Sequence, residues 1–427
     1  MPQSTSATSE HQIDLTILHP MDPWHQGMGG FDTCIDGILR YAPPSWSIEV
    51  IGLSANPEER PVGKWTELRF ADRSIRFFPA LADRDPTMVR SIPLALRFAL
   101  ACRQLGTVPH GKVIQIHRFE SGFGIRPNSH QKAVYFFHNH PEEVDSQYSD
   151  VRWRRFRRLF QALMARRMRG AAAAVAVDPR TPAWVAGRFP WLDGRAALLP
   201  GWADPRLFSP GTMAERTSAR RALRSRLGLE REAKIVAFVG RIERQKDPLM
   251  MIEAFAELAR LEAGVTLVVL GDGRLRESMR RRAESLGQGG RVHFLAPTDR
   301  ESVAGLYRAS DVLACTSGFE AGPRVIFEAL ASGTPVVSFD VGQVSEVLGP
   351  GAPEEIGGLV AARDPRLFAW ALASVLSLPA SAARAARCAA AVRTFTPRRA
   401  LAELFEMYGR WIAEGERAAV EAKPRKL

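Results

Sequence analysis

In the first half of the chain, short apolar runs alternate with longer segments in which apolar residues recur at helical spacing. Strands are expected at residues 13–18, 48–53, 113–117, 134–137 and 173–177, and helices at 31–41, 92–103 and 153–168. Strands separated in this way by helices are typical of βαβ units, which build parallel sheets. The first half therefore predicts one α/β domain.

The second half repeats the same alternation more regularly. Strands are expected at residues 234–240, 265–271, 291–295, 311–315 and 335–339. Each run is too apolar to have a solvent-facing side, which favours a parallel sheet covered by helices on both faces. Residues 200–211, PGWADPRLFSPG, are rich in Pro and Gly and predict the linker between the two halves.

These patterns divide the chain into four parts. A chain of 427 residues exceeds the usual size of a single core. We expect a disordered arm at 1–12, a first α/β domain at 13–204, a second α/β domain at 205–396, and at 397–427 an amphipathic helix that packs back towards the first domain, followed by a tail. The fold class expected is α/β, with two Rossmann-like, doubly wound domains facing across a cleft. Ligands of such sheets bind at the carboxyl ends of the strands.

The composition indicates an ordinary globular protein, with 46% hydrophobic and 24% charged residues. No run of about 18 apolar residues predicts a membrane-spanning helix, and the polar N-terminus lacks the layout of a signal peptide. The four cysteines are scattered, without a CxxC pair or a histidine at metal spacing. These features predict a cytoplasmic protein with reduced thiols and no metal site.

The formal charge of +12 is concentrated in one segment. Between Arg152 and Arg169 there are eight arginines and no acidic residue, interleaved with apolar residues at helical spacing. Such a helix can lie on an anionic membrane surface, on the inner face of the plasma membrane. The residues expected to contact it are Trp153, Arg154, Phe156, Arg157 and Phe160.

Two other interpretations of this basic segment remain open. It can be a helix that packs on the first sheet with a basic outer face. A pI of about 10.1 also raises the possibility of a nucleic-acid-binding module. Aromatic residues interleaved on a strand face are missing, however, so no nucleic-acid partner is expected.

A loop with two cations follows the strand KIVAFVG, which ends at Gly240. Arg241 comes next and Lys246 five residues later, before an Asp-Pro pair that is typical of a helix start. A guanidinium grips phosphate oxygens at two points, and an ammonium supplies a compact charge beside it. The alternative is that both are solvated surface cations.

The segment GFEAGPRVIFEALASGTPVV at 318–337 carries two glutamates eight residues apart. Glu328 lies in a short helix that is apolar on nearly every face, so its carboxylate needs a partner, which a ribose could provide. Glu320 precedes that helix, near an N-terminus that favours anions. A structural salt bridge is the alternative for either residue.

Together these motifs resemble the retaining glycosyltransferases of family 4, which have the GT-B architecture. The arrangement GR-x4-K, followed by S-x2-E-x7-E and EALASGTPVV, carries the resemblance, which is strong over residues 239–348. It implies that residues 13–204 form the acceptor-binding domain and residues 205–396 the nucleotide-sugar-binding domain. In the second domain, Arg241 and Lys246 would bind the donor diphosphate, Glu328 the ribose, and Glu320 would contact the donor sugar. The backbone amides of Ala321 and Gly322 would lie beside that sugar and the phosphates.

The resemblance extends more loosely to the first half. The loop HQGMGG at 25–30, with Gly29 and Gly30, resembles the glycine-rich loop that approaches the phosphates. His138 matches the histidine that hydrogen-bonds the transferred sugar. His140 lies two residues on and His117 ends the preceding strand, so the choice among the three rests on this match. The catalytic residues expected are His138, Glu320, Arg241 and Lys246.

The resemblance implies a retaining hexosyltransferase that uses a nucleotide-diphosphate sugar and needs no further cofactor. Its acceptor would be a glycan or a lipid-linked glycan, in the biosynthesis of a bacterial surface polysaccharide. Asp83-Arg84-Asp85 matches the DxD signature of metal-using transferases, but it falls in a polar loop and is interpreted as a surface feature. The alternatives are a nucleotide-sugar epimerase or hydrolase of the same architecture, and an inactive partner subunit.

Overall fold

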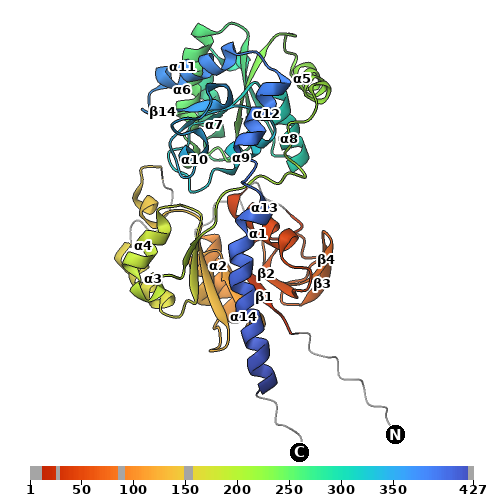
Figure 1. Cartoon of the computed structure of the whole chain (residues 1–427), viewed down its shortest axis with the longest axis vertical. Helices are drawn as coiled ribbons and strands as arrows, with labels where there is room; N and C mark the ends of the chain where they lie inside the picture. Colours follow the sequence, from red (N-terminus) through yellow and green to blue (C-terminus); the bar gives the residue numbers. More distant parts are fainter. Residues whose placement is uncertain (1–11, 26–28, 85–91, 149–156, 422–427) are drawn as a thin grey trace, which may run out of the picture.

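The computed structural model describes residues 12–25, 29–84, 92–148 and 157–421. They form two α/β domains, and in Figure 1 the first domain lies below the second. The arm expected at 1–12 lies almost entirely outside the described residues. The expected fold of two Rossmann-like, doubly wound α/β domains is confirmed by the two sheets.

The first sheet has eight strands in the order β3-β4-β2-β1-β5-β6-β7-β8. All neighbours are parallel except β3 and β4, which form an antiparallel pair. The strands are β1 (Leu15–Leu18), β2 (Ile48–Ser54), β3 (Thr66–Phe70), β4 (Arg73–Ala82), β5 (Val113–Ile116), β6 (Lys132–Phe137), β7 (Ala173–Ala176) and β8 (Ala196–Leu198). The five strands expected here are confirmed, whereas β3, β4 and β8 were not expected.

The second sheet has six parallel strands in the order β11-β10-β9-β12-β13-β14. They are β9 (Lys234–Val239), β10 (Val265–Leu270), β11 (Val292–Leu295), β12 (Val312–Cys315), β13 (Val336–Phe339) and β14 (Gly357–Val360). The apolar runs predicted the first five. In both β10 and β12 every residue is buried, as expected for strands covered on both faces.

Helices cover both sheets. In the first domain they are α1 (Gly30–Tyr41), α2 (Leu94–Gln104), α3 (Arg157–Met168) and α4 (Thr181–Arg188). In the second they are α5 (Met213–Leu227), α6 (Pro248–Leu261), α7 (Arg276–Ser285), α8 (Arg300–Ala309), α9 (Arg324–Ala331), α10 (Ser345–Leu348), α11 (Pro365–Ser377) and α12 (Ala382–Ala391). Asp247 caps α6 by accepting a hydrogen bond from the Met250 amide, and Pro248 is its first residue, as the Asp-Pro pair predicts.

The order of the strands places the binding region of each domain. In the first sheet the chain winds outward from β1 through β2, then returns to β5 on the other side of β1. In the second sheet β9 lies in the same way between β10 and β12. Loops that leave the carboxyl ends of such neighbouring strands diverge and form a crevice. The loops after β1 and β5, and after β9 and β12, are therefore the places to look for a site.

The end of the chain returns to the first domain. Helices α13 (Pro397–Ala400) and α14 (Ala402–Glu421) follow the second domain, and α14 lies along the first domain in Figure 1. Leu404 and Tyr408 of α14 share a core cluster with Ile17 of β1. The buried Tyr408 hydroxyl accepts a hydrogen bond from Gln115 Nε2 of β5 at 3.0 Å. The chain thus passes between the domains twice.

Candidate active site

Lys246 and Glu320 meet at the carboxyl ends of β9 and β12. The Lys246 side chain folds back over the end of β9, where a Cβ on Gly240 would lie 3.4 Å from Lys246 Cε. Its ammonium forms an ion pair with Glu320 Oε1, which also accepts a hydrogen bond from the Ser317 hydroxyl at 2.9 Å. Glu320 is 8% exposed. Two residues expected in the donor site are therefore in direct contact.

Arg241 lies on the same loop as Lys246 and extends towards the first domain. Its charge and that of Arg118, the second residue after β5, both act on Asp32 of α1. Burial raises the pKa of Asp32, and the two guanidinium groups oppose that rise. Part of the Arg118 side chain is exposed to solvent. Loss of hydration on its protein side lowers the pKa of its guanidinium, as expected in the wall of a crevice. The sequence analysis did not single out Arg118 or Asp32.

Glu328 is buried within α9, as its apolar neighbours predict. The Tyr307 hydroxyl lies 3.5 Å from its Oε2, and Arg300 Nη2 lies 3.6 Å from its Oε1. Arg300 also lies 3.4 Å from Asp36 in α1 of the first domain. Burial raises the pKa of Glu328, although the charges of Arg300 and Arg324 favour its ionised form. The carboxylate therefore lies next to the boundary between the domains, with long contacts to its protein partners.

Arg324 begins α9 and crosses to the linker and the first domain. Its guanidinium lies 3.6 Å from the centre of the Trp202 ring, within the linker sequence PGWAD. Its charge also acts on the buried thiol of Cys34 in α1. Its Nη1 is buried without a hydrogen-bond partner in the described part of the chain. The sequence analysis gave this arginine no role, because its partners lie far away along the chain.

His138 follows β6 and lies among aromatic rings and other histidines. It stacks on Phe31 of α1 with ring centres 4.0 Å apart, and its Nε2 lies 2.9 Å from Nδ1 of His117. Burial lowers the pKa of His138 well below its ordinary value, and His117, Arg324 and Arg118 lower it further. The imidazole is therefore neutral at pH 7 and can exchange hydrogen bonds with a hydroxyl.

The other two candidate histidines have different surroundings. His117 is buried and also contacts Gln115 Oε1 at 3.3 Å. His140 caps a short 3-10 helix, η2 (Pro141–Asp145), by accepting a hydrogen bond from the Glu142 amide at 3.3 Å. Of the three, His138 is the one whose pKa is influenced by cations from both domains.

The expected glycine and backbone positions also lie near this boundary. Gly29 precedes α1 and Gly30 is its first residue, with open space where a Cβ would stand on Gly30. A Cβ on Gly322 would lie 3.0 Å from Val177 of the first domain. Ala321 is buried beside it. The small residue at position 322 therefore allows the loop before α9 to approach the end of β7.

One cluster in the described structure has the donor atoms for a metal ion. Cys34 Sγ and ring nitrogens of His117 and His138 all lie within 4.8 Å of one another. The two imidazoles already contact each other, and Arg324 stands beside the thiol. Burial raises the pKa of Cys34 to about 11, so the thiol stays protonated. A divalent cation would have to displace this proton next to a fixed positive charge, so we assign no metal to the cluster.

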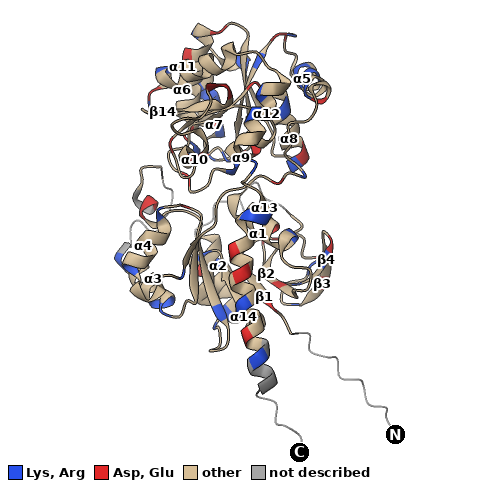
Figure 2. Ribbon diagram, in the orientation of Figure 1, with Lys and Arg blue, Asp and Glu red and all other residues tan. Residues whose placement is uncertain are grey.

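The basic helix is described only from Arg157 onwards. Trp153, Arg154, Phe156 and the side chain of Arg157 lie outside the described part of the structure. Phe160 packs against Phe119 with ring centres 5.5 Å apart. Met164 and Met168, on the same side of α3, are buried in the first-domain core. Basic residues on α3 are visible in Figure 2. Among the described residues, no helix is long and apolar enough to span a bilayer.

The structure corrects the interpretation of Asp83 as a surface residue. Asp83 follows β4, is 3% exposed, and forms a 2.7 Å ion pair with Arg97 of α2. Its partner in the DxD match, Asp85, lies outside the described residues. The loop is polar in sequence, yet its first carboxylate is buried because Arg97 neutralises it. A structural role therefore explains Asp83.

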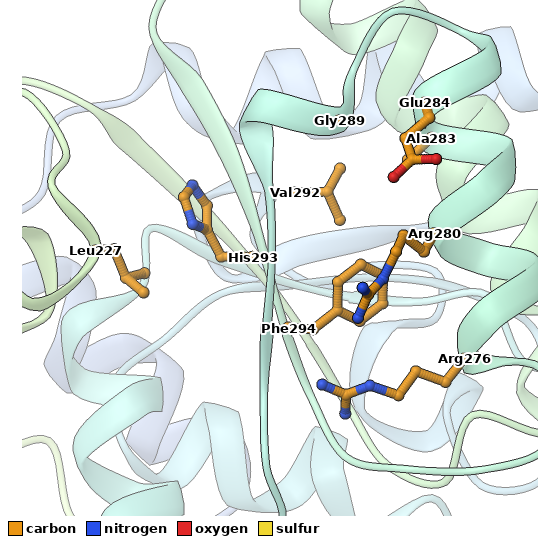
Figure 3. A pocket seen from close by; sticks show the side chains of 9 residues that line it. All are labelled: Leu227, Arg276, Arg280, Ala283, Glu284, Gly289, Val292, His293 and Phe294. Carbon is orange, nitrogen blue, oxygen red and sulfur yellow. The ribbon is translucent and has the colours of Figure 1, made fainter.

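A separate surface pocket lies beside the edge strand β11 (Figure 3). Arg276 and Arg280 of α7 lie over the Phe294 ring there, at 5.3 and 5.6 Å from its centre. The pocket shares no residue with the group between the domains. The pocket lies at the edge strand of the sheet, away from the loops after β9 and β12, so we do not interpret it as the donor-binding site.

Comparison with known proteins supports the resemblance found in the motifs. Residues 219–393 match the model of the family "Glycosyl transferases group 1". The chain is 36% identical over 189 residues to D-inositol 3-phosphate glycosyltransferase from Corynebacterium urealyticum. This match covers 43% of the present chain and 43% of that relative, so the chain spans less than half of the relative's length.

Solved structures are similar over nearly the whole chain. Sucrose-phosphate synthase from Thermosynechococcus elongatus has a TM-score of 0.72 at 19% identity, covering 94% of this chain and all of that one. HepE from Anabaena, in complex with UDP and glucose, has a TM-score of 0.64 at 17% identity, covering 93% and 99%. At these identities the likeness establishes the shared fold.

Proposed function

We propose that the whole chain is a retaining glycosyltransferase, because residues 219–393 match the family of group 1 glycosyl transferases. In this proposal it transfers a hexose from a nucleoside-diphosphate sugar to an acceptor hydroxyl. The second domain binds the donor and the first domain binds the acceptor. The observation that supports this most is the ion pair of Lys246 and Glu320 at the carboxyl ends of β9 and β12.

Lys246 and Arg241 would stabilise the departing nucleoside diphosphate. Charge develops on the leaving group as its bond to the sugar breaks, and preorganised cations are most effective there. A diphosphate beside Lys246 competes with Glu320 for the ammonium. Binding of the donor would thus free Glu320 to accept a hydrogen bond from a hydroxyl of the donor sugar. In this proposal cations of the protein neutralise the leaving group.

Glu328 and His138 would position the two ends of the donor. The long contacts of Glu328 leave its oxygens able to accept hydrogen bonds from the ribose hydroxyls. His138, kept neutral by burial, would bind a hydroxyl of the transferred hexose. The acceptor then attacks on the face that the diphosphate leaves, which gives retention of configuration.

The acceptor is the part of the proposal with the least support from the chain itself. We propose a glycan or lipid-linked glycan of a bacterial surface polysaccharide. The basic helix α3 of the first domain would favour an acceptor held at an anionic membrane. Relatives are named for D-inositol 3-phosphate, so an acceptor panel should hold that compound and a sugar phosphate as well.

A two-stage experiment tests the proposal. Melting temperatures are measured with UDP-glucose, UDP-N-acetylglucosamine and GDP-mannose, because a ligand that binds the folded state raises its stability. The best donor is then incubated with D-inositol 3-phosphate, fructose 6-phosphate and a lipid-linked oligosaccharide. We expect acceptor-dependent release of the nucleoside diphosphate and a product with the anomeric configuration of the donor. If no donor raises the melting temperature, the proposal is wrong.

The same assay separates the proposal from an epimerase or hydrolase. Those enzymes would convert the donor at full rate without any acceptor. A glycosyltransferase releases the nucleoside diphosphate slowly until its acceptor is added. A donor-only rate equal to the rate with acceptor would therefore favour the alternative.

A further inference from the structure

The segment that follows β6 leaves the first domain and covers the loop that carries Glu320. The ring of Tyr148 lies against Gly318, where a Cβ would come within 2.3 Å of it. Arg363 lies 4.9 Å from the centre of the same ring and donates a hydrogen bond to the Ser317 carbonyl at 2.9 Å. These contacts place Tyr148 against the donor loop.

Glu143 lies in this segment, on η2, and its side chain is largely buried. Only 11% of its side chain is exposed. Its Oε1 accepts a hydrogen bond from Arg180 Nη2 at 2.5 Å. Its other oxygen, Oε2, is buried and has no hydrogen-bond partner among the residues that the structure describes. Buried carboxylate oxygens are nearly always satisfied, so an unpaired one indicates a missing donor.

A purely structural role as the partner of Arg180 leaves this arrangement unexplained. Arg180 is 59% exposed and is already held by Asp178, through contacts of 3.0 Å from Nε and 2.6 Å from Nη2. It has no need of a second, buried carboxylate.

The charges around Glu143 set its proton affinity. Burial raises its pKa to about 7, Arg180 opposes the rise, and Asp178 and Glu320 add to it. Arg180 and Asp178 come from the loop between β7 and α4, and Glu320 from the second domain. His140 and Glu142 are the neighbouring titratable groups on its own segment. At neutral pH the carboxyl is thus divided between its acid and base forms, as suits a group that transfers protons.

We propose that Glu143 is the general base that binds the attacking hydroxyl of the acceptor through Oε2. As the acceptor oxygen forms its bond to the anomeric carbon, the bond from that carbon to the diphosphate breaks and its electron pair leaves with the diphosphate. The hydroxyl proton passes to Oε2 and is afterwards lost to solvent. The inference rests on the proposed function, because it names the residue of the first domain that acts on the acceptor.

The variant Glu143→Gln tests this assignment, with Glu142→Gln as its matched control. Glu142 is the exposed neighbour on the same short helix. Rates are measured with the best donor and acceptor of the panel above. For Glu143→Gln we expect kcat to fall about 100-fold, as for loss of a general base, while the donor-induced rise in melting temperature stays as in the wild type. Glu142→Gln should keep the wild-type kcat.

The pH profile gives a readout that a structural role would not move. In the wild type kcat/KM should decline as the pH falls below about 7, because Glu143 becomes protonated. This acidic limb should be missing from the residual activity of Glu143→Gln. In Arg180→Met the limb should move to higher pH, because Arg180 no longer favours the carboxylate. A Glu143→Gln variant with the wild-type rate and pH profile would overturn the inference. Absence of transfer by the wild type would instead overturn the proposed function.

Discussion

The carboxyl-end edges of the two sheets, which face each other between the domains, satisfy their polar groups in different ways. On the second domain, carboxylates are matched with cations: Glu320 with Lys246, and Glu328 with Arg300. On the first domain, His138 and His117 are neutral rings that contact each other and Phe31. One edge therefore suits a ligand with a large negative charge, and the other suits uncharged hydroxyls.

This difference suggests how the proposed reaction is divided. The ionised groups of the second domain would bind the nucleoside diphosphate, so the affinity for the donor should depend on a few charged side chains. Neutral hydrogen bonding on the other side can position a sugar without competing for the diphosphate. Variants of the two edges should therefore fail in different ways.

The largest effect is expected for Lys246→Ala. Loss of the ammonium removes a cation from the leaving group and leaves Glu320 without its ion-pair partner. We expect kcat/KM for the donor to fall about 100-fold and the donor-induced rise in melting temperature to disappear. Arg244→Ala, an exposed cation in the same loop, is the control and should change neither quantity. Near-normal kcat/KM in Lys246→Ala would contradict the donor site.

Glu328→Gln should reduce donor affinity with less effect on the chemical step. Hydrogen bonds to a charged acceptor contribute about 1.5–3 kcal/mol, so we expect the dissociation constant for UDP to rise by roughly tenfold or more. Titration calorimetry with UDP measures it. The control is Glu301→Gln, an exposed acid in the first turn of α8. Unchanged UDP affinity would remove Glu328 from the nucleotide site.

His138→Ala tests the other edge. Because a neutral hydrogen bond contributes about 0.5–1.5 kcal/mol, kcat should fall roughly three- to tenfold. The affinity for UDP should stay within about twofold of the wild type, because the neutral His138 ring offers no charge to the diphosphate. His130→Ala, at an exposed position, serves as the control. A large loss of UDP affinity in His138→Ala would break the comparison between the two edges.

The neutral histidines also predict a pH dependence of stability. Burial lowers the pKa of His117 from 6.5 to about 3, so the unfolded chain takes up a proton below pH 6.5 that the folded chain refuses. Stability is therefore lost as the pH falls from about 7 towards 3, by about 2 kcal/mol at pH 5 from this residue. Denaturant unfolding at pH 7 and pH 5 should show a smaller difference for His117→Gln than for the wild type. Equal differences would show that His117 is not held neutral.

The sequence predicted the second sheet better than the first for a physical reason. Buried parallel strands are largely apolar, and β9, β10, β12 and β13 stand out as such runs. The edge strand β3 alternates partly buried and exposed residues, and β4 is interrupted by arginines and Pro79, so neither resembles a buried strand in the sequence. The two glycines of β14 conceal it in the same way.

Among the residues of the site, those in sequence motifs could be predicted, and those defined by contacts between distant parts of the chain could not. Lys246 and Glu320 belong to motifs that can be found along the chain. Glu143 lies in an acidic run that resembles an ordinary turn, and its surroundings depend on Arg180 and Glu320, far away in the sequence. Arg118 and Arg324 likewise gain significance only when the two domains meet. Contacts between domains leave no periodic pattern in a sequence.

The double passage of the chain between the domains limits how they can move. The outgoing linker and the returning segment are joined where the Ala203 amide donates a hydrogen bond to the Phe395 carbonyl at 3.1 Å. Two adjacent covalent connections permit the domains to tilt about the point where they touch, but they resist twisting and sliding. Loops that face each other across the boundary can thus separate to admit a ligand and return to the same register. A single flexible tether would have to find that alignment again in every catalytic cycle.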